Sequence, residues 1–424
     1  MSMTQTQQQN VPTLRFPEFS GEWKPSKLKD FSEVKRGAGS QYIKYSTKAD
    51  GGLRLVRIGD FLGSEPVYVE PTKSIKRFVL AQGDILIAGT GATAGITFSI
   101  PDEFVGLAYS YNAPRIRQSS NSSDFLINYL KSPYLEKQRA RLFTGNAQPF
   151  LDTTDIRNFK FGIPSLPEQQ KIASFLSSVD SRIAQLGEKK ALLQLYKKGM
   201  MQKLFSQTLR FKDKDGNDFP DWQEKRLGDL YEFKSTNSLS RDKLNYDGGE
   251  VRNIHYGDIH TKFNSAFDLS RELVPFINSD VDLSRISEDK YCHKGDLVIA
   301  DASEDYDDIG KTIELINLND EKVLAGLHTL LARLTSKDIH IGFGTFVMAC
   351  APVRKQIKII AQGTKVLGIS TRRMAKIKLP TPCPEEQQKI TAFLSAIDQK
   401  IDLVSNELTH AKAFKKGLLQ QMFV

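Results

Sequence analysis

Basic, amide and imidazole side chains gather in the turns of both halves of the chain, where they could bind nucleic acid. Lys and Arg suit phosphate oxygens and guanine edges, whereas the amides of Asn and Gln suit adenine. The first half carries Lys35, Arg36, Lys44, Arg54, Arg57, Tyr109, Tyr111, Asn112, Arg117, Asn146 and Gln148. The second half carries Arg252, Asn253, His255, His260, Lys262, His328, Lys365, Arg372 and Arg373. Each of these residues alone could equally be a solvated polar group. The two sets therefore indicate nucleic-acid binding without identifying which residues contact which bases.

The sequence contains no residue pattern typical of a catalytic site or of a metal-binding site. His255 and His260 are five residues apart, a spacing that does not place two side chains on one helical face. The glycine-rich run 89–95 lacks the Lys-Ser/Thr of a phosphate-binding loop and favours a turn that lets the backbone approach DNA. Residues 213–217 resemble a calcium loop, but their glycine stands in the wrong place. The acidic run 301–308 favours a solvated loop. We therefore predict no catalytic residue and no metal site in this chain.

Composition points to a polyanionic partner inside a cell. Lys and Arg number 59 against 50 Asp and Glu, which gives a net charge of +9 over 424 residues. The three cysteines are widely separated, as expected in a reducing compartment. No apolar run is long enough to cross a bilayer. The sequence predicts a soluble cytoplasmic protein of two or three domains without a membrane partner.

The chain repeats itself with an offset of 218 residues. Residues 168–205 match residues 386–423 at 15 of 38 positions, beginning with Glu-Gln-Gln-Lys-Ile in both copies. The same offset places Arg115 on Arg333, and shorter offsets place Arg57-Ile58-Gly59-Asp60 on His255-Tyr256-Gly257-Asp258. Function must therefore be argued for a pair of similar units.

Each copy ends in one long amphipathic helix. Apolar residues recur at steps of three, four or seven, as in a coiled-coil seam. The seam positions are Ile172, Leu176, Val179, Ile183, Ile390, Leu394, Ile397 and Ile401. At 1.5 Å per residue such a helix is roughly 55 to 60 Å long. It is too long to pack only on its own globular part, so we expect the two helices to pair in antiparallel fashion.

The globular parts read as mostly β, with local helices expected over 123–144 and 341–360. The predicted fold class is α+β, with a circular pseudo-twofold order in which the N-terminal arm closes on the C-terminal helix. The predicted segments are an arm 1–26, a globular domain 27–163, a helix 164–208, a linker 209–225, a second globular domain 226–380 and a helix 381–424.

The repeated motifs resemble the specificity subunit of type I restriction-modification systems. They are Pro-x-x-Pro-Glu-Gln-Gln-Lys-Ile from Pro164, Pro-x-Pro-Glu-Glu-Gln-Gln-Lys-Ile from Pro382, the Lys-Lys-Gly helix ends, and Arg-Phe followed by Pro-x-Trp from Arg210 to Trp222. The resemblance covers essentially the whole chain. It implies two target recognition domains that each read half of an asymmetric bipartite site in double-stranded DNA.

The same resemblance implies the partners. The long helices are expected to set the half-site spacing and to dock two methyltransferase subunits, and restriction and translocase subunits are expected to complete the assembly. The chain itself is expected to be non-catalytic and to bind no cofactor. S-adenosylmethionine, ATP and Mg²⁺ are expected on the partner subunits, in a bacterial or archaeal cytoplasm.

Two other classes of protein stay open from the residues alone. One is a DNA-modifying or DNA-cleaving enzyme with an unrecognised active site, which assays of the chain alone for methyl transfer and cleavage separate from the main hypothesis. The other is a coiled-coil adaptor that binds no DNA, which salt-dependent binding to duplex DNA excludes.

Overall fold

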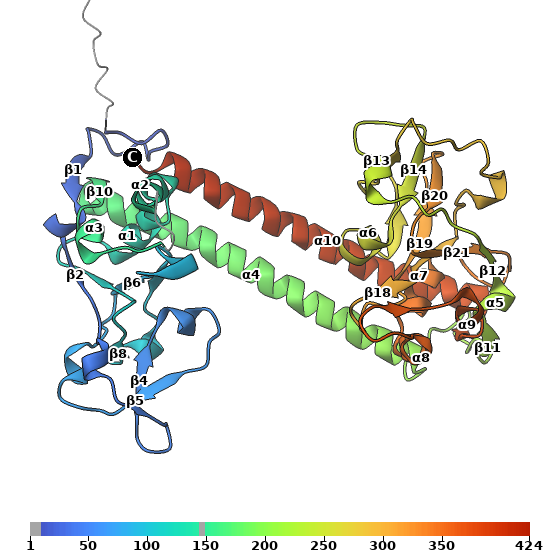
Figure 1. The fold of residues 1–424 in the computed structure, drawn as a ribbon, viewed down its shortest axis with the longest axis horizontal. Helices are drawn as coiled ribbons and strands as arrows, with labels where there is room; N and C mark the ends of the chain where they lie inside the picture. Colours follow the sequence, from blue (N-terminus) through green and yellow to red (C-terminus); the bar gives the residue numbers. More distant parts are fainter. Residues whose placement is uncertain (1–9, 144–148) are drawn as a thin grey trace, which may run out of the picture. The chain divides into compact units, whose positions relative to one another are not determined.

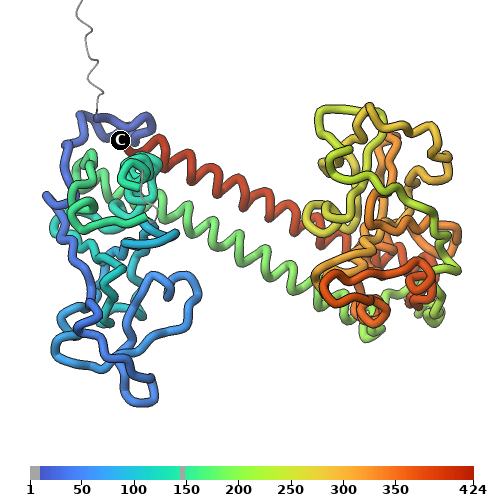
Figure 2. The backbone as a smooth tube through the Cα atoms, in the orientation of Figure 1, coloured from blue at the N-terminus to red at the C-terminus, as the bar shows by residue number. Residues whose placement is uncertain are grey.

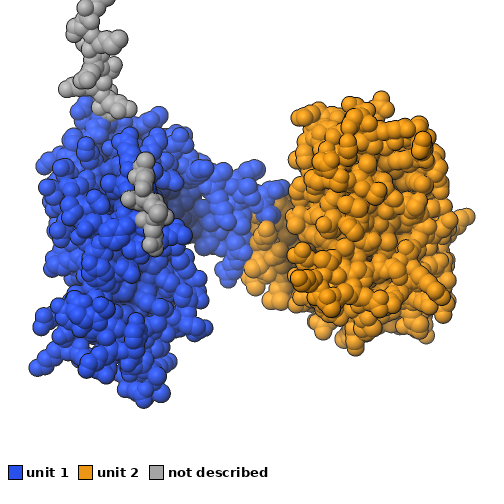
Figure 3. Space-filling view, in the orientation of Figure 1, with its two compact units in different colours: residues 1–188, 405–424 blue, residues 189–404 orange. Residues whose placement is uncertain are grey.

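The computed structural model describes residues 10–143 and 149–424 and divides into two compact units, coloured in Figure 3. Unit 1 is drawn from Met1–Glu188 and Ser405–Val424, and unit 2 from Lys189–Val404. Two long helices contribute to both units, α4 (Leu166–Phe205) and α10 (Pro384–Gln421). Figure 2 follows the backbone through each unit in turn.

Unit 1 holds small sheets and short helices around the first half of α4. Its strands are β1 (Lys24–Lys27), β2 (Ser32–Lys35), β3 (Tyr45–Ser46), β4 (Leu53–Val56), β5 (Val67–Val69), β6 (Ile85–Ile87), β7 (Thr97–Ser99), β8 (Ala108–Tyr109), β9 (Arg115–Gln118) and β10 (Lys160–Ile163). Its short helices are α1 (Ser123–Leu130), α2 (Pro133–Phe143) and α3 (Thr153–Arg157). The strands pair in the orders β2-β9-β6-β7, β3-β5-β4-β8 and β1-β10.

Unit 2 holds a similar set around the second half of α4. Its strands are β11 (Gln223–Arg226), β12 (Tyr231–Lys234), β13 (Leu244–Asn245), β14 (Val251–Ile254), β15 (Ala266–Asp268), β16 (Phe276–Ile277), β17 (Leu297–Ala300), β18 (Ala302–Ser303), β19 (Thr312–Asn317), β20 (Lys322–Ala325), β21 (Thr329–Leu334), β22 (Leu367–Gly368) and β23 (Lys378–Thr381). Its short helices are α5 (Leu227–Leu230), α6 (Tyr256–Thr261), α7 (Phe343–Ala349), α8 (Ala351–Ile360) and α9 (Thr371–Met374).

The sheets of the two units have the same strand order. The sheet β12-β21-β17-β19 matches β2-β9-β6-β7, β13-β16-β14-β20 matches β3-β5-β4-β8, and β11-β23 matches β1-β10. Unit 2 adds β15 at the edge of its largest sheet and a small β18-β22 pair. The predicted α+β fold class and the internal repeat are therefore confirmed.

The two local helices expected over 123–144 and 341–360 are each a pair of shorter helices, which corrects the prediction. In unit 1 the break falls before Pro133, and in unit 2 it falls at Cys350, one residue before Ala351-Pro352. Proline lacks the N–H that would continue the preceding helix and suits the first turn of a new one. The two prolines were visible in the sequence, but the apolar periodicity continued across each break and therefore indicated a single helix.

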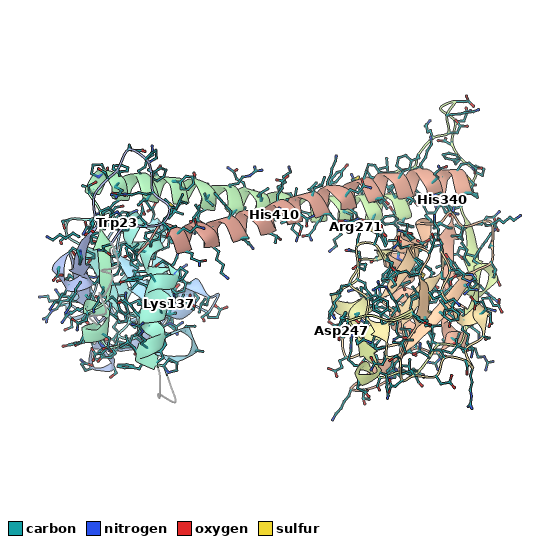
Figure 4. All side chains as sticks on the ribbon, turned by 90° about the horizontal axis from the view of Figure 1, so that it is seen from above. Trp23, Lys137, Asp247, Arg271, His340 and His410 are labelled. Atoms are coloured by element: carbon teal, nitrogen blue, oxygen red, sulfur yellow. The ribbon has the colours of Figure 1, made fainter. Side chains whose placement is uncertain are left out.

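The Glu-Gln pair at the start of each long helix fixes that helix to its unit. In unit 1 the Glu168 carboxylate accepts hydrogen bonds from Arg15 at 2.7 and 2.8 Å and from the Trp23 indole at 3.2 Å. The next residue, Gln169, accepts from the Ser122 backbone and donates to the Pro164 carbonyl. Figure 4 shows Trp23 beside the start of α4.

Unit 2 repeats these contacts residue by residue. The Glu386 carboxylate accepts from Arg210 at 2.8 Å and from the Trp222 indole at 2.9 Å. Gln387 accepts from the His340 backbone at 2.8 Å, and Figure 4 shows His340 beside the first turns of α10. Both glutamates are almost fully buried. The repeated motif is thus structural in both copies, because its polar atoms are consumed inside the unit.

The long helices run antiparallel to each other within each unit. In unit 1 the Lys415 ammonium lies 2.5 Å from Asp180, and in unit 2 the Lys197 ammonium lies 2.6 Å from Asp398. These two ion pairs join the same repeat positions. Among the described residues, no helix is both long enough and apolar enough to cross a membrane.

The predicted seam residues lie on the faces that pack inside each unit. Ile172 and Leu176 are buried in the core of unit 1 beside Leu418 and Met422 of α10, with Val179 at its edge. In unit 2 the buried core includes Ile390, Leu394 and Ile397 with Leu204 and Phe205 of α4, and Ile401 packs against it. Ile183 is partly exposed. The stripe therefore joins each helix to its globular part as well as to the other helix.

Candidate nucleic-acid interface

A cavity of about 700 Å³ opens where β4 and β8 end in unit 1. These two strands are parallel neighbours, so the residues that follow them meet at one edge of the sheet. Arg57, Thr90, Tyr111 and Asn112 line the cavity, and Tyr111 and Asn112 are exposed. Arg57 donates to the Glu65 carbonyl at 2.7 Å. The structure therefore brings three of the predicted residues together in one concave surface.

A second hollow of about 460 Å³ in the same unit is strongly basic. Its lining includes the predicted residues Lys35, Arg36, Tyr109 and Arg117, and also Arg77, Arg115 and Arg157. The Arg36 guanidinium lies 4.5 Å from the ring of Tyr111, which lines the first cavity. Sequence reasoning missed Arg77 and Arg157 because they follow no strand-like run, and only their residue type could have indicated them.

Two predicted residues of this group serve the fold. Tyr109 is buried, and burial raises the pKa of its hydroxyl. Arg117 donates two hydrogen bonds of 2.7 Å to the buried Asp84 carboxylate, which raises the pKa of the Arg117 guanidinium. The fold therefore accounts for both side chains without a contact to DNA.

The repeat assigns Arg117 a different counterpart from the one that the sequence offset gave. In unit 2 Arg333 donates to Asp296 at 2.8 and 2.9 Å, as Arg117 does to Asp84. The offset of 218 had placed Arg115 on Arg333. The strands β2 and β12 are equivalent, and their first residues face Gln118 of β9 and Leu334 of β21 respectively. The offset between β9 and β21 is therefore 216 residues and not 218. A two-residue difference in loop length between copies explains the error.

Unit 2 carries an aromatic and imidazole cluster at the ends of β14, β17 and β20. The Tyr256 ring lies 4.7 Å from His255, 5.2 Å from His328 and 6.1 Å from His260, measured between ring centroids. His328 Nδ1 lies 3.4 Å from Asp301. The structure therefore brings together all three predicted histidines. Sequence reasoning did not identify Tyr256 as a member of this cluster, although the repeated Gly-Asp motif directly after Tyr256 was visible in the sequence.

Burial and charge set the protonation states in this cluster. Burial, helped by the nearby Arg241 guanidinium, lowers the pKa of His255. The His255 ring accepts a hydrogen bond from the Gly257 backbone at 3.2 Å, which requires an unprotonated Nδ1. Burial also raises the pKa of Asp301, and His328 opposes that rise. Lys262 and Arg241 are both paired with the buried Asp258 carboxylate.

The other predicted residues lie apart from these surfaces or are held by neighbours. Arg54 pairs with Asp60 at 2.9 Å, and Arg252 pairs with Glu321 at 2.5 Å. Lys44 lies 3.8 Å from Glu70, and Asn253 is fully buried. The remaining residues are Lys365, exposed in the loop before β22, Arg372 and Arg373, both on α9, and Asn146 and Gln148, which lie outside the described residues.

Two of the three motifs set aside are turns, whereas the acidic run 301–308, expected as a solvated loop, begins with the short buried strand β18. Residues 91–93 form one 3-10 turn between β6 and β7. The Asp213 carboxylate accepts from the backbones of Asp215 and Asn217 at 2.8 Å, as in an Asx turn. Across residues 10–143 and 149–424, no three His, Cys, Asp or Glu side chains are arranged to hold a metal ion.

Comparison with known proteins agrees with this architecture. The model of the family described as "Type I restriction modification DNA specificity domain" matches residues 20–195 and again residues 220–413. Two proteins of Methanocaldococcus jannaschii, named as the MjaX and MjaVIII specificity subunits of type I restriction enzymes, are similar in sequence. They are 23% and 25% identical to this chain, and the matches cover 97% and 81% of it and 95% and 79% of the relatives.

Solved structures show the same fold. The type I restriction-modification S subunit from M. genitalium superposes with a TM-score of 0.56 at 15% identity, covering 98% of this chain and 99% of the other. The family model matches both copies of the repeat and most of the sequence. The chain therefore belongs to the family of type I restriction-modification DNA specificity subunits.

Proposed function

We propose that this chain is the non-catalytic DNA-reading subunit of its complex, and that each unit reads one half of an asymmetric bipartite site. The observation that carries the proposal is the repeat of one scaffold with different side chains on its surface. Identical strand orders hold the cavity of unit 1 and the imidazole cluster of unit 2. Two similar frames with unlike surfaces suit two unlike half-sites, whereas a symmetric dimer reads two equal ones.

The basic hollow of unit 1 supports a role in phosphate binding. Arg77 is exposed at its rim, Lys35 ends β2 beside Glu33, and Arg36 follows that strand. Guanidinium and ammonium groups position a protein on the backbone of a duplex, and base edges are then read by neighbouring groups. The adjoining cavity, with its amide, hydroxyl and aromatic lining, offers such groups.

Docking of methyltransferase subunits is supported by apolar surface on the long helices. In unit 2, Leu192 and Leu195 of α4 are 58% and 65% exposed. A groove of about 540 Å³ lies near them, lined by Met201 and Phe205 of α4 and by Pro352 of α8. Tyr196 of α4 and Phe414 of α10 stand at the same repeat position, and both are about half exposed. Apolar surface of this kind marks protein contacts.

The remaining parts of the complex follow from this assignment. S-adenosylmethionine is expected on the methyltransferase subunits, and ATP and Mg²⁺ on restriction and translocase subunits that join the same assembly.

Methylome sequencing tests the proposal. The chain is expressed with the methyltransferase subunit of its host in a strain that lacks other DNA methylation. We expect one asymmetric motif of two short defined parts separated by unspecified bases. The chain alone is assayed in parallel for methyl transfer and DNA cleavage, and we expect neither. Methyl transfer or cleavage by the chain alone would establish the enzyme alternative and overturn the non-catalytic assignment.

A further inference from the structure

Matching backbone hydrogen bonds show which positions of the two units are equivalent at the ends of the strands. The Ser110 backbone, after β8, donates to the Val56 carbonyl at the end of β4, and the Gly326 backbone, after β20, donates to the Ile254 carbonyl at the end of β14. After β6, the Gly89 backbone donates to the Asn112 carbonyl at 2.9 Å. After β17, the Asp301 backbone donates to the His328 carbonyl at 3.0 Å. Asn112 and His328 therefore occupy one position of the shared scaffold.

A further pair of bonds fixes the same frame from the other side. The Leu151 backbone donates to the Gly89 carbonyl at 2.8 Å, and the Ile369 backbone donates to the Asp301 carbonyl at 2.9 Å. Both strand pairs, β4 with β8 and β14 with β20, are parallel. Figure 1 shows β14 and β20 side by side in unit 2. The junction of these strand ends is therefore held by matching backbone hydrogen bonds in both units.

The side chains at this junction differ in every property that matters for base recognition. Arg57 in unit 1 corresponds to His255 in unit 2, Ile58 to Tyr256, Gly89 to Asp301 and Asn112 to His328. A shared hydrogen-bonded frame with exchanged polar groups is what a reading position requires, because the frame must present different chemistry at the same place. The equivalence of Arg57 and His255 was visible in the sequence, whereas that of Asn112 and His328 was hidden because the loop lengths around them differ between the copies.

We propose that Asn112 and His328 are specificity-determining residues, each for one base pair of the half-site that its own unit reads. This inference rests on the proposed function. Asn112 is exposed in the cavity of unit 1, and its amide makes no hydrogen bond to any residue that the structure describes. A free amide offers a donor and an acceptor together, which match the N6 and N7 atoms of adenine. Asn112 therefore selects adenine.

His328 presents a different set of atoms from the same position. Its ring is half exposed, its Nδ1 faces Asp301 at 3.4 Å, and it packs at nearly a right angle to the Tyr256 ring. With Nδ1 turned toward the carboxylate, Nε2 is the atom left to meet a base, and a single ring nitrogen cannot form the paired contact of an amide. The second half-site therefore carries a different preference at the equivalent position.

Exchange of the two residues tests the proposal in the assembled complex. Asn112→His and His328→Asn are each combined with the methyltransferase subunit. Methylation rates are measured on duplexes in which every defined position of the site is varied singly. Asn112→His should lower the preference for adenine about 10- to 100-fold at one position of one half-site. His328→Asn should change the preferred base toward adenine at one position of the other half-site. All remaining positions should keep their preferences.

Both substitutions suit the backbone. His328 has a φ of 55°, a left-handed conformation that Asn adopts more readily than most residues, and Asn112 does not have a positive φ. Size-exclusion chromatography checks that each complex assembles. His293→Asn, at the opposite end of β17, and Asn158→His, after α3, are matched controls that should leave every preference unchanged.

The outcomes separate this inference from the proposed function. If the unsubstituted complex methylates no bipartite site, the proposed function fails. If it does, and both exchanged variants keep every base preference, the assignment of Asn112 and His328 is overturned while the proposed function stands. A change spread over both half-sites from one substitution also overturns it.

Discussion

A few buried polar residues make the same structural contacts in both units. Glu168 and Glu386 are buried carboxylates, and each ties an arginine and a tryptophan of the preceding arm to the first turn of a long helix. The following glutamines, Gln169 and Gln387, tie the same turn to the loops of the globular part. The side chains proposed to read DNA, in contrast, lie at the ends of strands, where the two units differ.

Removal of the Glu386 charge should destabilise unit 2. In Glu386→Gln, Arg210 and the Trp222 indole lose an anionic acceptor in a buried position, at a cost of about 3 kcal/mol. Hydrogen exchange of the 223–234 and 378–394 peptides, which reports on unit 2 separately, measures the change. Gln388→Ala, at the exposed neighbour, is the control and should be nearly neutral. Equal protection in both variants would show that the buried pair adds no stability.

The stability of unit 2 should depend on pH through Glu314. Burial raises the pKa of this carboxyl from 4.5 to about 7, although the backbones of Gly342 and Thr345 donate to it. The folded state therefore keeps a proton that the unfolded chain releases, and stability falls as pH rises from about 4.5 to 7. The expected loss is about 3 kcal/mol over that window.

Thermal unfolding at pH 5 and pH 8 measures this effect. Glu314→Gln removes the titrating proton, so the difference in stability between the two pH values should shrink by the same amount. The shift must appear in the comparison of variant and unsubstituted chain, because other groups titrate in both. An unchanged pH profile in Glu314→Gln would contradict the assignment.

At the scale of elements, the long helices were the part most readable from sequence, because apolar periodicity sustained over about forty residues is typical of a long helix and of no strand. The structure places α4 at Leu166–Phe205 and α10 at Pro384–Gln421. The short elements were less readable. The helix pairs α1–α2 and α7–α8 were expected as single helices, and strands of two or three residues carry too little pattern to register against each other.

The apolar surface of α4 should be needed for the partner and not for the fold. Leu192→Glu with Leu195→Glu should leave the circular dichroism of the chain unchanged and reduce affinity for the methyltransferase subunit at least tenfold, because both side chains are more than half exposed. Sedimentation of the mixed subunits measures assembly. Glu188→Gln with Gln185→Glu, exposed on the same helix outside the groove, is a polar control. Assembly of the double glutamate variant at full affinity would remove this face from the docking surface.

The length of the helices should set the spacing of the half-sites. We expect four residues inserted after Gly187 in α4, and four after Ser405 in α10, to lengthen the spacer by at most one or two base pairs. Four residues add about 6 Å of helix and base pairs stack about 3.4 Å apart. Two-residue insertions, which turn the apolar faces away from the core, should abolish assembly. Methylome sequencing reads the spacer, and unchanged spacing in an active four-residue variant would leave the helices as a docking surface only.

At the scale of the whole molecule, the order of the chain is circular. In unit 2 the Leu209 backbone donates to the Lys203 carbonyl across a continuous stretch of chain, and in unit 1 the Leu14 backbone donates to the Gln421 carbonyl between the two ends. The repeat and the family could be predicted from the motifs because their residues are structural in both copies. The proposed reading surface could not be predicted in this way, because its residues differ between the two copies. The equivalence of Asn112 and His328 emerges only from backbone hydrogen bonds. Arg333 was misaligned because the loop lengths differ between the copies.

The central claim is that each unit reads its own half-site independently, and exchange of one globular part tests it most directly. Lys27 of β1 faces Lys160 of β10, so residues 28–159 can be replaced from another family member between two paired strand ends. The hybrid is expressed with the methyltransferase subunit, and its methylome is sequenced. We predict that one half of the methylated site changes, while the other half and the spacer stay the same. A hybrid that methylates a site altered in both halves, or altered in neither, would contradict the account.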